Sequence, residues 1–199
     1  MQPDPNFYIE SPRLFLSHLI ADNPKHCELI SNLFYKQSET EGPENTEKAK
    51  NFINGRCNSL LARLGYGIFL CSLKTESNEL KDATPVGIIT LIKGDETQEG
   101  EIACTLPDVG FQMLPREMRK GYATEGAQAV IRYATEKLGL EGVVGFTSTT
   151  NIASQRTLEK VGLEYRGERN LAAFGEEPSK VYALHGMKDL KEYNIPDDA

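Results

Sequence analysis

A strand pattern, a basic turn and a helix pattern follow one another directly in residues 108–138, and this unit restricts the fold more than any other segment. Apolar and polar residues alternate from Asp108 to Leu114 before Pro115 ends the run, as in a strand with two unlike faces. After Gly121 the apolar positions recur at helical spacing, at Ala127, Val130, Ile131, Ala134 and Leu138. The helix is therefore predicted to lay this stripe against a sheet.

The turn between strand and helix is rich in positive charge and contains Arg116, Arg119, Lys120 and Gly121. The first backbone N–H groups of a helix have no partner inside it, and the helix dipole adds about half a positive charge at that end. Glycine lets an anion approach the backbone without meeting a side chain. The turn is either a phosphate-binding site or an ordinary solvated basic loop, and spacing alone does not decide between them.

The remaining segments complete a mixed α/β pattern. Strands are predicted at residues 13–17, 66–73, 86–92, 143–148 and 180–184, and helices at 22–36, 46–64 and 152–161. The segment 101–105 either joins the strand at Asp108 or forms a short strand of its own. Asp22 or Asn23 caps the first helix, Gly55 weakens the second, and Asn151 and Gly162 bound the third.

This order predicts a mixed sheet, antiparallel in its first half, with helices on both faces. The connection from Met113 through the helix to Val143 should be a right-handed crossover between parallel neighbours, which can part to form a cleft. The segment before Arg13 and the tail from Lys188 are expected to be loose.

Composition limits the function. A chain of 199 residues with 39% hydrophobic and 26% charged residues indicates one globular domain, and no apolar run is long enough to span a membrane. No secretory signal precedes the first strand, so we expect an intracellular, cytoplasmic protein. The net charge of −7 argues against a general nucleic-acid binder and suits a local anion site with a cationic second substrate.

The cysteines and histidines do not predict a metal site. Four scattered cysteines form no CxxC pair, and the three histidines have no zinc-ligand spacing. We interpret the cysteines as small buried hydrophobic residues rather than disulfides or catalytic thiols, with Cys104 the least certain of the four.

Two sequence blocks, RKGYATEGAQAVIRYATEKLGL and NIASQRTLEKVGL, resemble signature blocks of the GNAT superfamily of N-acetyltransferases. The opening ESPRLFL, the GYATE block and the Asn-x-x-Ser that precedes Leu-Glu-Lys-x-Gly are most similar to the branch typified by ribosomal-protein-alanine acetyltransferases. The resemblance covers about residues 9–186. It implies a single GNAT-like domain over 1–199 with short flexible termini, a mostly antiparallel sheet and one splayed parallel strand pair.

The resemblance also implies an acetyl-CoA site. The backbone amides of residues 118–124 would hold the pyrophosphate, and the strand from Phe111 to Leu114 would pair with the pantetheine arm. Asn151 would bond to the pantetheine and Ser154 would reach the sulfur, although Asn151 also fits a helix cap. The implied cofactor-binding residues are Phe111, Gln112, Met113, Leu114, Met118, Arg119, Lys120, Gly121, Tyr122, Ala123, Thr124, Asn151 and Ser154.

Two positions depart from the superfamily pattern. Met118 stands where a polar or aromatic residue is usual, which should weaken a grip made mainly of backbone N–H groups only modestly. Leu158 stands where many members carry a tyrosine general acid, so that role does not transfer, and Ser154 is the closest remaining hydroxyl.

Acetyl transfer to an amine needs positioning above all, together with a base for the ammonium proton and a donor for the departing thiolate. A backbone N–H near Gln112 or Met113 is the candidate to polarise the thioester carbonyl. Asp108 and Glu101 are the candidate bases, although Asp108 equally fits a solvated strand end. Glu125 is assigned to structure, as an acid favoured in the first helical turn.

The predicted function is therefore an acetyl-CoA-dependent N-acetyltransferase that acts on a primary amine by direct transfer in a ternary complex. The acceptor is either a peptide or protein N-terminus or a small amine, because one superfamily can keep its cofactor site and vary the other. The alternative is a non-catalytic acyl-CoA-binding sensor or assembly module. A nucleotide kinase or dehydrogenase is rejected, since neither GxxxxGK[ST] nor GxGxxG after a strand occurs.

Overall fold

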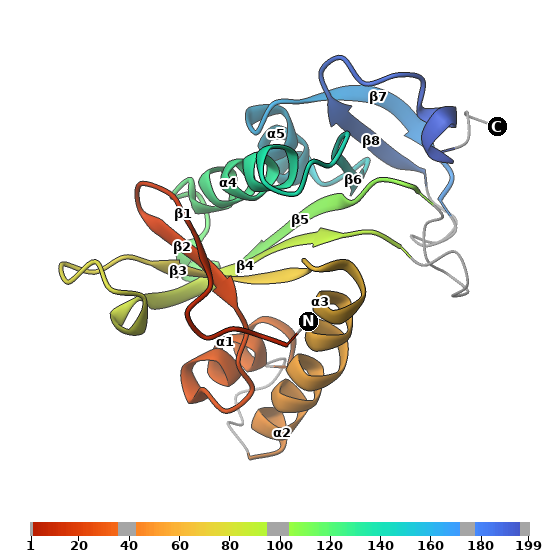
Figure 1. Ribbon diagram of the computed structural model, residues 1–199. Helices are drawn as coiled ribbons and strands as arrows, with labels where there is room; N and C mark the ends of the chain where they lie inside the picture. The colour runs from red at the N-terminus through yellow and green to blue at the C-terminus, as the bar shows by residue number, and fades with distance from the viewer. Residues whose placement is uncertain (1, 36–42, 95–103, 172–177, 196–199) are drawn as a thin grey trace. The chain divides into compact units, whose positions relative to one another are not determined.

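The computed structural model describes residues 2–35, 43–94, 104–171 and 178–195 (Figure 1). Hydrogen bonding orders the eight strands of this part of the chain as β1-β2-β3-β4-β5-β6-β8-β7. Strands β5 and β6 are parallel, whereas β1–β2, β2–β3, β3–β4, β6–β8 and β7–β8 are antiparallel. The mixed, mostly antiparallel sheet with one parallel pair is confirmed.

The chain forms two compact units, which are described separately. The first unit contains Met1–Thr90 and Phe111–Ala129, and the second contains Leu91–Gly110 and Val130–Ala199. Strands β4 (Thr84–Ile92) and β5 (Asp108–Met113) and helix α4 (Tyr122–Glu136) each contribute residues to both units.

The first unit is built on β1 (Tyr8–Glu10), β2 (Leu14–His18), β3 (Ile68–Leu73) and most of β4. Helices α1 (Pro24–Phe34), α2 (Pro43–Phe52) and α3 (Asn58–Leu64) cover one face of these strands, and the start of α4 covers the other (Figure 1). Leu14, Leu16, Ile30, Ile53 and Ile89 are fully buried in its core. Asn23 caps α1 as predicted, since its side chain accepts a hydrogen bond from the Lys25 N–H.

The helix predicted over 46–64 is interrupted by a π-helical turn, Ile53–Cys57, which contains Gly55. The buried residues Ala49, Ile53, Cys57 and Leu61 recur every four positions, a longer spacing than the 3.6-residue period of an α-helix. The wider π turn keeps them on one side. Gly65, with φ +77°, ends α3 in the left-handed conformation.

The second unit is built on β6 (Val144–Ser148), β7 (Leu163–Arg169) and β8 (Ser179–Leu184), with helix α5 (Ile152–Lys160) and the start of β5. Strand β8 was predicted and β7 was not. The pairing of β7 with β8 shifts register between Tyr165 and Glu168, and Gly167 between them has φ +101°. This irregularity removes the regular alternation by which a strand is recognised.

Near both limits of the described chain, residues that the sequence predicted to be loose form regular structure. Tyr8–Glu10 forms strand β1, and the ring of Phe7 stacks on His18 with centroids 4.2 Å apart. Near the other end, a 3-10 helix (Leu190–Tyr193) and Ile195 place three buried side chains in a core cluster with Cys104, Leu106 and Val144. The prediction of a frayed tail was wrong for residues 190–195, because its apolar residues are too widely spaced to form a periodic pattern.

The sequence predicted no membrane-spanning segment, and the structure tests this for its helices. Among the described helices, none is both long and apolar enough to cross a membrane.

Replacing Gly87 with alanine should destabilise the protein, because Gly87 lies against the neighbouring strand in the first unit. A Cβ at this position would lie 2.4 Å from the Gln112 carbonyl oxygen and 2.7 Å from the Met113 sulfur. Overpacking of this kind costs about 2 kcal/mol of unfolding free energy, measurable by urea titration. Gly55→Ala is the matched control, since nothing lies within 4 Å of its Cβ, and it should cause no loss. Equal stability of the two variants would contradict the close contact.

Candidate functional site

The turn of residues 118–124 follows β5 as the sequence predicted. Strand β5 ends at Met113, a short 3-10 turn covers Pro115–Glu117, and α4 begins at Tyr122. The turn itself, together with Phe111–Met113 and the start of α4, lies in the first unit. The predicted succession of strand, basic turn and helix is therefore confirmed.

The backbone of this turn is shaped to present donors. Arg119 has φ +62° and Gly121 has φ +84°, so two left-handed residues flank Lys120. The first backbone bond of the helix end runs from the Glu125 N–H to the Gly121 carbonyl at 3.0 Å. Within the part of the chain that the structure describes, the N–H groups of residues 119–124 donate to no other residue. A curled run of unused donors at a helix start is a known form of anion site.

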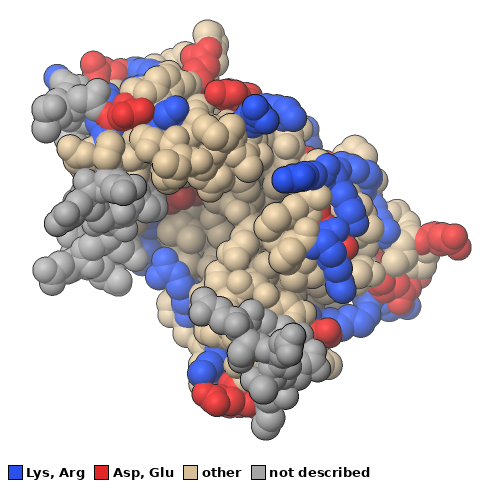
Figure 2. Space-filling view, turned by 180° about the vertical axis from the view of Figure 1, so that it is seen from behind, with Lys and Arg blue, Asp and Glu red and all other residues tan. Residues whose placement is uncertain are grey.

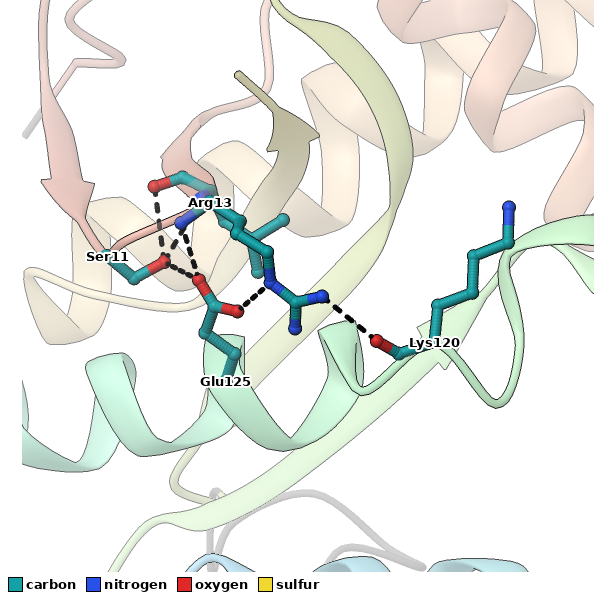
Figure 3. A network of polar contacts seen from close by, with 5 residues as sticks. Ser11, Arg13, Lys120 and Glu125 are labelled. Atoms are coloured by element: carbon teal, nitrogen blue, oxygen red, sulfur yellow. Dashed lines mark hydrogen bonds and ion pairs between the residues drawn. The ribbon is translucent and has the colours of Figure 1, made fainter. Parts of the chain in front are cut away.

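Glu125 ties this turn to the beginning of β2 (Figure 3). One of its carboxylate oxygens accepts hydrogen bonds from the Ser11 hydroxyl at 2.8 Å and the Arg13 backbone N–H at 2.7 Å. The other accepts from Arg13 Nε at 2.6 Å. Burial acts to raise the pKa of the Glu125 carboxyl, but these donors outweigh it and hold the pKa below its usual value. Ser11 and Arg13 are therefore the partners of Glu125 in the structural role that the sequence assigned to it.

Arg13 is the residue that sequence reasoning missed. Its Nη1 donates to the Lys120 carbonyl at 3.1 Å, and its guanidinium carbon lies 4.8 Å from the centroid of the Tyr122 ring. Arg13 and Glu125 are separated by 112 residues, so no local pattern could pair them. The sequence offered one indirect signal: ESPRLFL, which contains Arg13, and GYATE, which contains Glu125, both belong to the same family resemblance.

Asn151 and Ser154 lie together at the start of α5 in the second unit. The Asn151 side chain accepts from the Ser154 N–H at 3.1 Å, so the predicted helix cap is confirmed. Ser154 is half-buried, and among the described residues its hydroxyl has no hydrogen-bond partner. That hydroxyl is therefore available to a ligand.

Gln155 fixes the chain immediately before this cap, a role not foreseen from the sequence. It is buried, and its Nε2 donates to the Ser148 carbonyl at 3.1 Å and the Thr149 carbonyl at 2.8 Å. Its Oε1 accepts from the Lys180 amine at 3.2 Å. The end of β6 and the start of α5 are thus held together by one amide.

Asp108 is half-buried and forms the register pair of β5 with β6, opposite Val144. Beyond Asp108, no further residue of β5 forms a ladder pair with β6 in the described chain. Of the strand predicted to pair with pantetheine, Met113 and Leu114 are buried and Phe111 and Gln112 are half-buried. The other candidate base, Glu101, lies outside the described residues.

Leu158, at which the superfamily resemblance implies a tyrosine in many members, is a core residue of the second unit, with 1% of its surface exposed. Its Cδ2 would lie 2.6 Å from a Cβ on Gly145, so this side chain packs directly on the backbone of β6. In this chain the position therefore serves packing.

The cysteines behave as buried hydrophobic residues. Burial raises the pKa of the Cys104 thiol to about 11 and that of Cys57 to about 12. Cys104 Sγ accepts a hydrogen bond from the Leu106 N–H at 3.4 Å. A thiol held protonated in this way is a poor nucleophile, which confirms the interpretation from sequence. In the described residues no three His, Cys, Asp or Glu side chains gather as metal ligands.

Comparison with known proteins connects these features. Residues 13–164 match the family model of an acetyltransferase (GNAT) domain. An FsC-acetyl coenzyme A-N(2)-transacetylase of Aspergillus fumigatus is 43% identical over 58 residues, which is 29% of this chain and 25% of that protein. The chain thus matches only a quarter of the length of this curated relative.

Solved structures share the fold over nearly the whole chain. A GNAT-family acetyltransferase from Bacillus anthracis superposes with a TM-score of 0.65 at 22% identity, covering 89% of this chain and 98% of the other. RimL, a ribosomal alpha-N-protein acetyltransferase in complex with coenzyme A, gives a TM-score of 0.64 at 16% identity, with 89% and 97% covered.

Proposed function

This chain belongs to the GNAT acetyltransferase family, and from that premise we propose that it moves the acetyl group of acetyl-CoA to a primary amine. The observation that carries the proposal is the turn of residues 118–124. Two left-handed residues and a helix start direct unused backbone donors outward at the end of β5. Such donors suit the diphosphate of a coenzyme.

The cofactor is held in this proposal by main-chain groups more than by side chains. Of the predicted residues 118–124, those from 119 onward offer unused N–H groups to the diphosphate, because the Met118 N–H donates to the Pro115 carbonyl at 3.3 Å. The strand from Phe111 to Leu114 is proposed to pair with the pantetheine amides, although the Leu114 N–H itself donates to the Val86 carbonyl at 2.9 Å. The side chain of Met118 is 53% exposed and contributes no charge, which fits a grip made by the backbone. Asn151 keeps its Oδ1 on the helix cap and has its amide N–H₂ left to donate to pantetheine.

The proposed direct transfer requires no covalent intermediate with the protein. A neutral amine attacks the thioester carbonyl, its proton leaves to a carboxylate directly or through water, and the thiolate departs with a proton from a nearby hydroxyl. Ser154 is the proposed donor to the thiolate. Asp108 and Glu101 are the proposed bases.

The acceptor is proposed to be a peptide or protein N-terminus, with a small amine as the other possibility. The branch resemblance supports the peptide, and one solved neighbour is a ribosomal alpha-N-protein acetyltransferase. The acidic net charge of −7 favours a cationic acceptor of either kind.

A second candidate is an acyl-CoA-binding module without turnover. The observation that favours it is Leu158, which fills the position of the usual general acid with a buried aliphatic side chain. This candidate keeps the diphosphate grip and lacks only proton donation to the thiolate.

Calorimetry with acetyl-CoA, followed by a thiol-release assay over a panel of N-terminal peptides, polyamines and small amines, tests the proposal. We expect saturable binding and thiol release that depends on one class of amine. Binding without thiol release for any amine would favour the sensor. If no heat of binding is detected at millimolar acetyl-CoA, both the transferase and the acyl-CoA-binding module are ruled out.

A further inference from the structure

We propose that Arg13 is a positioning residue for the diphosphate-binding turn: it fixes the backbone at Lys120 and neutralises Glu125 where the phosphates bind. The inference rests on the proposed function, because it assumes that the turn of residues 118–124 holds a diphosphate. It adds a residue from the start of the chain to a site otherwise formed by residues 111–124.

Arg13 contacts one residue within the turn and one residue just after it. Nη1 donates to the Lys120 carbonyl at 3.1 Å, and Nε donates to Glu125 at 2.6 Å (Figure 3). Lys120 precedes Gly121 and Glu125 follows the donor run, so one guanidinium spans the segment between them. A rigid planar fork with several donors is suited to such a double contact, which lysine cannot reproduce.

The guanidinium also lies beside the two residues at the centre of the turn. Its Nη2 would be 3.3 Å from a Cβ on Gly121, and its carbon lies 4.8 Å from the Tyr122 ring centroid. Figure 2 shows Lys and Arg side chains in a cluster on one face of the molecule. Half of the Arg13 side chain, 48%, stays exposed, so its position is set by these contacts rather than by burial.

The second part of the proposed role of Arg13 is to compensate the negative charge of Glu125. Glu125 is in the first turn of α4, and its side chain is only 16% exposed, so water screens its charge poorly. Unpaired, this carboxylate would repel a diphosphate bound to the same turn. Arg13 supplies the opposite charge at 2.6 Å, and the turn keeps the positive potential of its helix start.

Binding of acetyl-CoA to four proteins, measured by calorimetry, tests this. We expect Arg13→Ala to raise the Kd about tenfold, as for an uncompensated charge near the ligand at an effective dielectric constant of about 20. The double variant Arg13→Ala/Glu125→Gln should bind more tightly than Arg13→Ala, because it removes the repelling charge while the amide oxygen of the new side chain can still accept from Ser11. Arg132→Ala, which removes one exposed charge from the same helix, should match the wild type.

The outcomes separate the possibilities. If the wild type binds acetyl-CoA and Arg13→Ala binds equally well, the inference is wrong and the proposed function stands. A double variant that binds no better than Arg13→Ala, or an equal loss in Arg132→Ala, also overturns it. If the wild type does not bind acetyl-CoA, both the inference about Arg13 and the proposed function are wrong. Should Arg13→Ala fail to fold, Arg13→Lys replaces it and is expected to lose affinity with an unchanged melting temperature.

Discussion

Acetyl-CoA binding should be lost in Gly121→Asp, with a Kd raised by at least about a hundredfold relative to the wild type. The carboxylate would lie within a few ångströms of the diphosphate, and like charges about 5 Å apart at an effective dielectric constant of about 20 repel by about 3 kcal/mol. The Cβ of the new side chain would lie 3.3 Å from Arg13 Nη2, so the carboxylate would compete with Glu125 for the guanidinium. Calorimetry with acetyl-CoA measures the loss.

Gly121→Asn is the control that separates charge from shape. Asparagine and aspartate are nearly equal in size, and both tolerate the left-handed conformation that φ +84° requires better than other residues do. We expect the asparagine variant to bind acetyl-CoA more weakly than the wild type and far more tightly than the aspartate variant. Melting temperatures of the two variants should agree, which shows that the fold is kept. Wild-type affinity in Gly121→Asp would mean that the diphosphate binds elsewhere.

The parts of the fold that depend on neighbouring residues were predictable. The alternation in Asp108–Met113, the helical stripe after Gly121 and the caps at Asn23 and Asn151 are local rules, and the structure contains each of them. Strand β7 and the packed segment 190–195 were missed for the opposite reason. A bulged edge strand and three spaced apolar residues acquire meaning only from distant partners such as β8 and Leu106.

The candidate site divides in the same way. The proposed diphosphate site consists of consecutive main-chain groups, so a short sequence block is enough to predict it. The hydrogen bonds of Arg13 and Ser11 to Glu125 join residues 112 and 114 positions apart, and periodicity carries no information about such pairs. Leu158 shows a further limit: the sequence shows that the tyrosine is missing, and only the structure shows that the leucine in its place packs on Gly145.

Ser154→Ala should lower kcat about a hundredfold, which is the lower end of the range for general acid catalysis. The Kd for acetyl-CoA should change far less, because main-chain groups are proposed to hold most of the coenzyme. The substitution removes only the hydroxyl, which has no partner among the described residues. The Ser154 backbone N–H still donates to Asn151, and alanine is a good helix former, so the cap and the stability of α5 should be kept. Thiol release with the best amine of the panel gives kcat, and calorimetry gives the Kd.

Two further variants decide whether the hydroxyl itself acts. Ser154→Thr keeps a hydroxyl at the same position and should recover most of the turnover, which a purely steric role would not allow. Ser59→Ala removes an exposed hydroxyl from α3 and should leave kcat unchanged. Full turnover in Ser154→Ala would mean that the thiolate takes its proton from water. Because Leu158 is buried and aliphatic, Ser154 is the proposed proton donor at the start of α5, and that result would favour a reaction that depends on positioning alone.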